Sequence, residues 1–239
     1  MVPRMNYWCR TTSPTSLLPA AKYFDQLVLD TFTQRLNLNS IPDVARYQLS
    51  MPVRDGGFGL TSMVIVSPAA WYSGFLQAFC KISPMIASVD DLKEEIPFVQ
   101  TLLNCFNYFT KLKFPKNSPV SLDLKQFWMD RENNKRPRGT QRLIMSIIYK
   151  ERATALLQEY PRNSSTRARL TAVTAPYSGS WLTTAPIDPL FHLLDAHFAL
   201  ATRLRLGIPL FDNIKKCVCG ATMSQDLLHS FKCEPYYSA

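Results

Sequence analysis

Glycine is scarce in this sequence, and long apolar runs are missing altogether. Only 8 of the 239 residues are glycine whereas 17 are proline, a balance that favours short helices separated by proline breaks over a β-sandwich. No stretch approaches the ~20 apolar residues of a membrane span. The first ten residues contain no apolar segment like that of a secretory signal peptide. We therefore expect a helical protein of the cytoplasm or the nucleus, without a membrane partner.

The residue patterns of catalysis are missing as well. Asp90 and Asp91 superficially resemble the paired aspartates of polymerases, but the residues before them are not strand-like. The residues after them are typical of a helix start, so helix capping explains the pair better. Three glycines between positions 56 and 59 indicate a turn, without the Lys-Ser/Thr pair of a phosphate-binding loop. The sequence predicts no catalytic residues and no enzymatic activity for this chain alone.

Apolar residues and positive charge are both abundant. Hydrophobic residues make up 46% of the chain, which is enough for a sizeable core. The net charge is +9 and the sequence pI is about 9.3, a balance that favours polyanionic partners, with RNA or DNA first among them. The charge alone is equally compatible with an ordinary basic protein that its charge keeps soluble.

Several segments carry apolar residues at helical spacing. Residues 20–38 and 140–159 each present one apolar face, and residues 98–109 form an apolar stripe typical of a core helix. Ser67-Pro68 is typical of an N-cap followed by proline at the first helical position. These segments predict a mainly α-helical, multi-helix domain.

A further helix is expected from Asp188-Pro189 to Leu206. Its apolar stripe would place His197 in the core as a hydrogen-bonded histidine rather than a ligand. Arg203 and Arg205 would lie in the last turn, where cations suit the helix dipole, and a glycine and a proline would end the helix.

The cysteines fall into two groups. Three lie in apolar segments and are expected to be buried thiols: Cys9, Cys80 and Cys105. Three more cluster with a histidine near the end of the chain: Cys217, Cys219, His229 and Cys233. In a reducing compartment such a cluster favours a metal over disulfides, and four ligands of these types suit one structural, tetrahedral Zn²⁺. The Cys-x-Cys start is tighter than the usual ligand spacing, so the alternative is unremarkable cysteines beside a surface histidine.

These patterns divide the chain into a helical region, residues 1–212, with a joint at 130–140, and a small zinc-knuckle module, residues 213–239. Basic residues in the joint and around the metal ligands are candidates for phosphate contacts, although a solvated loop is the alternative for the joint. Phe231 could stack on an unpaired base or pack over the metal. The basic candidates are Arg131, Lys135, Arg136, Arg138, Lys215, Lys216 and Lys232.

Several phrases, taken in order, resemble the C-terminal part of non-long-terminal-repeat retrotransposon reverse transcriptases, beyond the polymerase thumb. Together they cover nearly the whole chain. They are Asn6-Tyr7-Trp8-Cys9-Arg10-Thr11 with Phe24-Asp25, Gln48-Leu49-Ser50-Met51-Pro52 with Gly56-Gly57-Phe58-Gly59-Leu60, Ala69-Ala70-Trp71-Tyr72-Ser73, Arg169-Leu170 with Trp181-Leu182 and Pro186, and Phe198 with Arg203-Leu204-Arg205-Leu206-Gly207-Ile208-Pro209. The cysteine and histidine cluster then falls where that family carries its zinc knuckle.

The resemblance implies a fragment that binds single-stranded or structured RNA or DNA. The family's palm, with its metal-binding aspartates, would precede Met1, and no residue of this chain matches a catalytic motif. Two alternatives stay open. In place of a nucleic-acid-binding fragment, the first alternative is a purely structural or non-functional helical remnant without a ligand, and the second is an accessory subunit beside a separately encoded catalytic chain.

Overall fold

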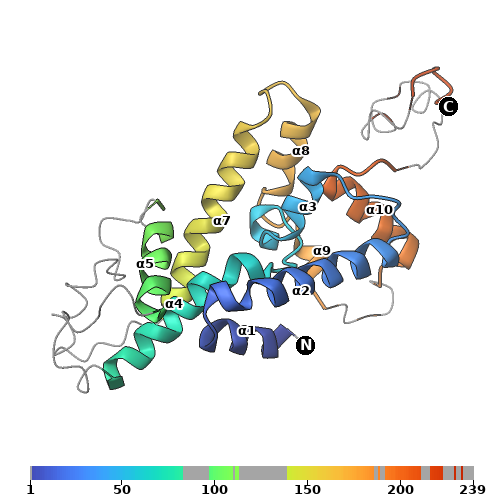
Figure 1. Cartoon of the computed structure of the whole chain (residues 1–239). Helices are drawn as coiled ribbons and strands as arrows, with labels where there is room; N and C mark the ends of the chain where they lie inside the picture. The colour runs from blue at the N-terminus through green and yellow to red at the C-terminus, as the bar shows by residue number, and fades with distance from the viewer. Residues whose placement is uncertain are drawn as a thin grey trace. The chain divides into compact units, whose positions relative to one another are not determined.

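The computed structural model describes residues 2–82, 97–109, 111–112, 139–185, 188, 192–210, 216–222, 229 and 233 (Figure 1). In these segments the regular elements are helices, and the β-structure is limited to a bridge between Lys216 and Thr222. The expected mainly helical fold is confirmed. No helix in these segments combines the length and the apolar character that a membrane span requires.

The chain divides into two compact units that alternate along the sequence. The first unit comprises residues 1–31 and 61–154, and the second comprises residues 32–60 and 155–239. The expected boundary at residue 212 and most of the expected joint, up to residue 138, lie outside the described residues.

The first unit is built on an apolar core. It contains α1 (Val2–Thr11), most of α2 (Pro14–Arg35), α4 (Met63–Ile82), α5 (Pro97–Phe109) and most of α7 (Thr140–Gln158). The largest fully buried side chains of this core are Tyr72, Phe79, Phe109, Met63, Leu76, Leu102 and Ile144. Small residues let α1 approach α4 closely, since a Cβ on Gly74 would lie 2.7 Å from the Arg10 carbonyl oxygen.

The start of α4 corrects one expectation. The helix begins at Met63 rather than at Ser67-Pro68, so Pro68 lies inside it. Asp25 of α2 supplies the cap, because its Oδ1 accepts the Met63 N–H at 2.7 Å. Ser62 donates to the same carboxylate at 2.6 Å and accepts the Ile65 N–H at 3.3 Å. A carboxylate brought from another helix thus binds the unpaired amides of the first turn and suits the dipole.

The Ser-Pro pattern does cap a helix elsewhere, at the start of α2. Ser13 Oγ accepts the Ser16 N–H at 3.2 Å, and Pro14 is the first helical residue. The helix therefore starts six residues before the expected residue 20, with Pro19 inside it. The apolar face is only partly as expected, because Phe24 is buried whereas Leu27 is 42% exposed.

The other helices of the first unit match their patterns closely. The Thr140–Gln158 span of α7 nearly coincides with the expected residues 140–159, with Ile144 and Ile148 buried. In α5, Leu102, Cys105 and Phe109 are buried as the stripe predicted. Cys9 and Cys105 are the buried free thiols that were expected, while the Cys80 side chain and Asp90 and Asp91 lie outside the described residues.

The second unit contains shorter elements. They are α3 (Asp43–Leu49), the 3₁₀ helix η1 (Val53–Asp55), α8 (Ser165–Val173), α9 (Ser180–Thr183) and α10 (Asp195–Leu206). The predicted glycine turn follows η1, with Gly56 and Gly59 at positive φ. A chain of edge-to-face aromatic contacts links distant segments, with centroid separations of 5.7, 6.0 and 5.6 Å along Phe32, Phe58, Trp181 and Phe198.

The α10 helix departs from its expected course at its start. The helix begins at Asp195, and residues 192–194 before it are not helical. Asp195 places a negative charge in the first turn, where it suits the helix dipole. His197 is exposed rather than buried in the core, and Leu194 and Phe198 are 65% and 36% exposed. The end is as expected, since Gly207 adopts a left-handed conformation with φ of 69°.

Candidate metal centre and a buried arginine network

The metal cluster is built on a tight turn. The Gly220 N–H donates to the Cys217 carbonyl at 2.8 Å, and the Cys217 N–H donates to the Ala221 carbonyl at 2.8 Å. Gly220 has φ of 85°, a conformation that costs little only for glycine, which explains the residue that follows the second cysteine. The turn and the Lys216–Thr222 bridge hold Cys217 and Cys219 near the same point.

The four candidate ligands converge as the sequence predicted. One ligand atom from each of Cys217, Cys219, His229 and Cys233 lies within 4.8 Å of every other. The Cys217 and Cys233 sulfurs are 3.4 Å apart, and the Cys219 sulfur is 3.1 Å from His229 Nε2. With Zn–S near 2.3 Å and Zn–N near 2.1 Å, a tetrahedral zinc site has ligand separations of about 3.6–3.8 Å. The cluster could therefore hold one metal ion.

The cysteines of this cluster are free thiols rather than a disulfide. Their environments differ, because hydrogen bonding from the Cys219 backbone lowers the pKa of Cys217. Desolvation raises the pKa of Cys233. Thiolates are the metal-binding form, so a metal held by this cluster would displace protons from its thiols.

Four protein ligands leave no open coordination position, so such a site is structural rather than hydrolytic. Cys217 and Cys233 are buried, while Cys219 and Val218 are exposed, so one side of the turn faces solvent. Among the predicted contacts around the cluster, Lys216 is exposed next to Cys217. The remaining predicted contacts lie outside the described residues: Arg131, Lys135, Arg136, Arg138, Lys215, Phe231 and Lys232.

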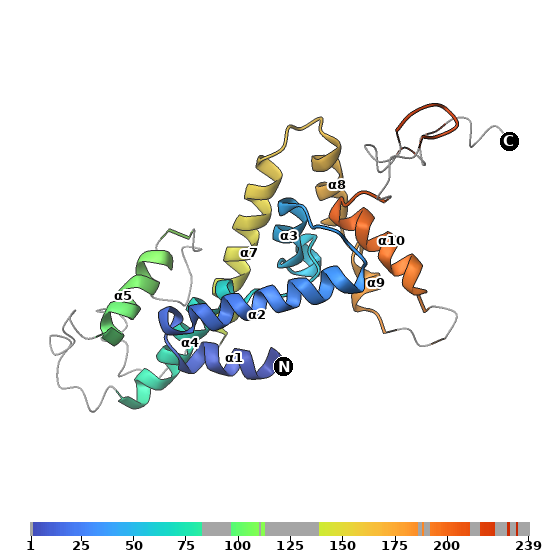
Figure 2. The ribbon, with the colours of Figure 1, turned by 45° about the vertical axis from the view of Figure 1, so that its right-hand side comes forward.

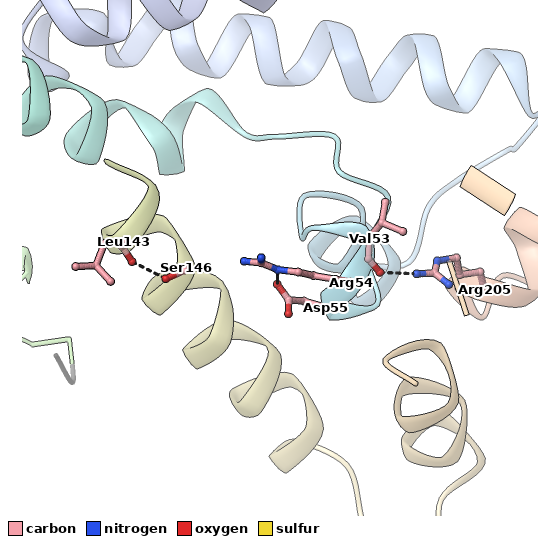
Figure 3. A network of polar contacts seen from close by, with 6 residues as sticks. All are labelled: Val53, Arg54, Asp55, Leu143, Ser146 and Arg205. Carbon is pink, nitrogen blue, oxygen red and sulfur yellow. Dashed lines mark hydrogen bonds and ion pairs between the residues drawn. The ribbon is translucent and has the colours of Figure 1, made fainter. Parts of the chain in front are cut away.

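Sequence reasoning missed a polar network at the centre of the second unit. Arg205 lies in the last turn of α10 as expected, but it is only 5% exposed, and its burial was not predicted from the sequence. Its guanidinium donates to the carbonyls of Val53 at 2.9 Å, Ser178 at 3.1 Å and Gly57 at 3.2 Å. Figure 3 shows the Arg205 side chain against Val53. The neighbouring Arg54 pairs with Asp55 at 3.6 Å, and its side chain points away from Arg205.

Gln48 and Arg169 complete this network. The fully buried Gln48 amide donates to the carbonyls of Gly56 at 2.6 Å and Arg205 at 3.1 Å. Arg169 donates to Gln48 Oε1 at 2.9 Å and to the Arg205 carbonyl. Burial lowers the pKa of Arg169 to about 10. Among the described residues no carboxylate pairs with either arginine, and the protein acceptors of both guanidinium groups are backbone and amide oxygens.

The glycines beside the network are required by space as well as by conformation. A Cβ on Gly207 would lie 2.6 Å from Arg169 Nε, and one on Gly179 would lie 2.2 Å from Val53 Cγ1. A Cβ on Gly57 would lie 1.9 Å from the Met51 carbonyl oxygen. The network therefore joins the glycine turn, the α8 arginine and the end of α10. All three segments belong to phrases that resemble the retrotransposon family, and that resemblance was the sequence signal that could have pointed to the network.

Comparisons with known proteins give no identity for this chain: no family model matches it, no curated protein matches it, and no solved structure matches it.

Proposed function

We propose that this chain is the region beyond the polymerase core of a non-long-terminal-repeat retrotransposon reverse transcriptase, and that it binds RNA or DNA through a zinc-stabilised knuckle. The observation that carries the proposal is the convergence of Cys217, Cys219, His229 and Cys233 on one point. Three thiols and one imidazole are ligands that zinc prefers, and a short segment without its own core needs a metal to fold.

Two further observations support the proposal. Lys216 is exposed beside the first ligand, and the chain as a whole carries a net charge of +9, which favours a polyanion. The phrases around Gln48, Arg169 and Arg205 also form one hydrogen-bonded network, so the residues behind the resemblance act together in the fold. The proposal assigns no catalysis to this chain alone, and we expect it to extend no primer.

A salt titration of nucleic-acid binding tests the proposed function. The ligand is a fluorescent single-stranded oligonucleotide, and binding is measured by anisotropy. On single strands the slope of log affinity against log salt is about −0.7 per phosphate contact, so five contacts give about −3.5. Replacing Lys215, Lys216 and Lys232 together by Ala should flatten that slope by about 2 if all three contact phosphates.

The metal arm of this test uses neighbouring positions of the turn. Cys219→Ser removes a ligand and should weaken binding, whereas Val218→Ser alters the 86% exposed residue between two ligands and should not. Phe231→Ala should weaken binding without loss of zinc if the ring stacks on a base, and should loosen the metal if the ring packs over it. Absence of binding at low ionic strength would leave a purely structural helical remnant as the better interpretation.

A further inference from the structure

The outward side of α1 combines aromatic and basic side chains. Tyr7 is 65% exposed and Trp8 is 51% exposed, and Arg4 and Arg10 are exposed on the same helix. The opposite side of the helix is packed, because Met5 and Cys9 are buried in the core of the first unit. The exposure of Tyr7 and Trp8 therefore belongs to a well-anchored helix rather than to a frayed end.

Helical geometry makes these side chains neighbours. At 3.6 residues per turn, Arg4, Tyr7, Trp8 and Thr11 fall within a sector of about 100°. We call these residues the basic aromatic face. Arg4 and Trp8 are four residues apart, as are Tyr7 and Thr11, and such pairs have Cβ atoms about 5–6 Å apart. The rings of Tyr7 and Trp8 therefore lie on either side of a line that runs along the helix from Arg4 to Thr11.

The segment that carries this face has charged residues of one sign. The first 24 residues contain Arg4, Arg10 and Lys22 and no aspartate or glutamate. Arg10 is held in place by the neutral Gln141 side chain, through contacts of 3.0 and 3.3 Å, so its charge is not cancelled there. Both views place α1 beside the first half of α2, which exposes Lys22 and a 68% exposed Tyr23 (Figures 1 and 2). A negatively charged partner with flat, stackable groups fits this surface.

We propose that the basic aromatic face of α1 is a second nucleic-acid contact, on which unpaired bases stack against Tyr7 and Trp8 while Arg4 on the face, and Arg10 beside it, contact phosphates. This inference rests on the proposed function but concerns a surface separate in sequence from the metal cluster. Bases in a duplex are already stacked on each other, so the face selects single strands. An apolar protein surface would contact the rings but leave the arginines unpaired. An acidic protein surface would pair with the arginines but offer no stacking groups to the rings.

Binding of a fluorescein-labelled oligouridine to the full chain tests the face directly. We expect the double variant Tyr7→Ser, Trp8→Ser to weaken binding by at least about tenfold, since stacking is worth ~1–3 kcal/mol per base. Tyr7→Phe with Trp8→Phe should restore most of the affinity, because both retain a ring. Arg4→Gln should reduce the salt slope by about 0.7. The double variant should bind a duplex of equal length with nearly the affinity of the wild type.

The matched control is Tyr177→Ser, which removes an 88% exposed ring from the second unit and should leave the affinity unchanged. Thermal unfolding of the double variant should be unchanged too, because both side chains are on the surface. If the wild type binds and the double variant binds equally well, the face serves another partner and the inference fails alone. If the wild type binds no oligonucleotide, the proposed function fails with it.

Discussion

The interiors of the two units are stabilised by different interactions. In the first unit the interior is mainly apolar, and residues such as Phe109 and Leu102 pack against other hydrophobic side chains. In the second unit the centre holds two guanidinium groups and an amide, joined to carbonyl oxygens of distant segments. Apolar packing tolerates apolar substitutions that conserve volume, whereas a buried hydrogen bond is lost when its donor or acceptor is replaced by an apolar group. The difference predicts where substitutions are accepted.

The largest expected effect is at the centre of the network. Arg205→Met leaves three carbonyls without their buried donor, and at about 1 kcal/mol or more each the loss of unfolding free energy should be at least ~3 kcal/mol. Chemical denaturation measures the loss, and hydrogen exchange should place it in the second unit. Arg54→Met is the control, since this 66% exposed side chain should cost less than about 0.5 kcal/mol.

Replacing one buried residue in each unit by methionine compares the two interiors directly. Gln48→Met removes donors to Gly56 and Arg205 and an acceptor for Arg169, and should cost about 2–3 kcal/mol. Leu102→Met keeps the volume and the apolar character of a buried position and should cost less than about 1.5 kcal/mol. Equal losses in denaturation experiments would show that the polar network is no more demanding than the apolar core.

A smaller effect is expected where a carboxylate caps a helix of the first unit. Asp25→Ala removes the acceptor of the Met63 N–H and should lower the unfolding free energy by about 1–2 kcal/mol. Asp30→Ala is the control on the same helix, because its bond to Gln26 is an exposed i, i+4 pair worth ~0.5 kcal/mol or less. A loss for Asp30→Ala as large as that for Asp25→Ala would mean that the cap has no special role.

The most subtle prediction concerns alkaline pH. Burial raises the pKa of Cys105 from 9.0 to about 12, so above pH 9 the unfolded chain releases a proton that the folded chain retains. The group thus stabilises the fold fully below pH 9, and this contribution is lost as the pH rises towards 12, by up to about 1.4 kcal/mol per pH unit. Cys105→Ala should flatten the fall of unfolding free energy over that range, and an unchanged fall would contradict the assignment.

The sequence predicted what depends on nearby residues. The span of α7 followed from its own apolar period, and the convergence of the metal ligands followed from ligand type and spacing, aided by a turn at Gly220. Both signals are local, so neither required knowledge of the tertiary structure.

The sequence misled where a distant partner decides the outcome. The cap of α4 comes from Asp25, 38 residues before Met63, so the Ser-Pro pattern inside the helix had no part in its start. Arg205 was predicted only as a cation in the last turn of a helix, and its burial depends on carbonyls of segments 27 to 152 residues away. The Asp188-Pro189 pattern placed the start of α10 too early, since the helix begins at Asp195, and the apolar Leu194 and Phe198 are exposed.

The metal content of the purified chain tests the central claim most directly. Elemental analysis should find one zinc per wild-type chain and one per chain of the Val218→Ser control. Cys219→Ser should lose the ion, because three remaining ligands hold zinc far more weakly than four. Substoichiometric metal in the wild-type chain, or full occupancy in Cys219→Ser, would contradict a zinc centre formed by Cys217, Cys219, His229 and Cys233.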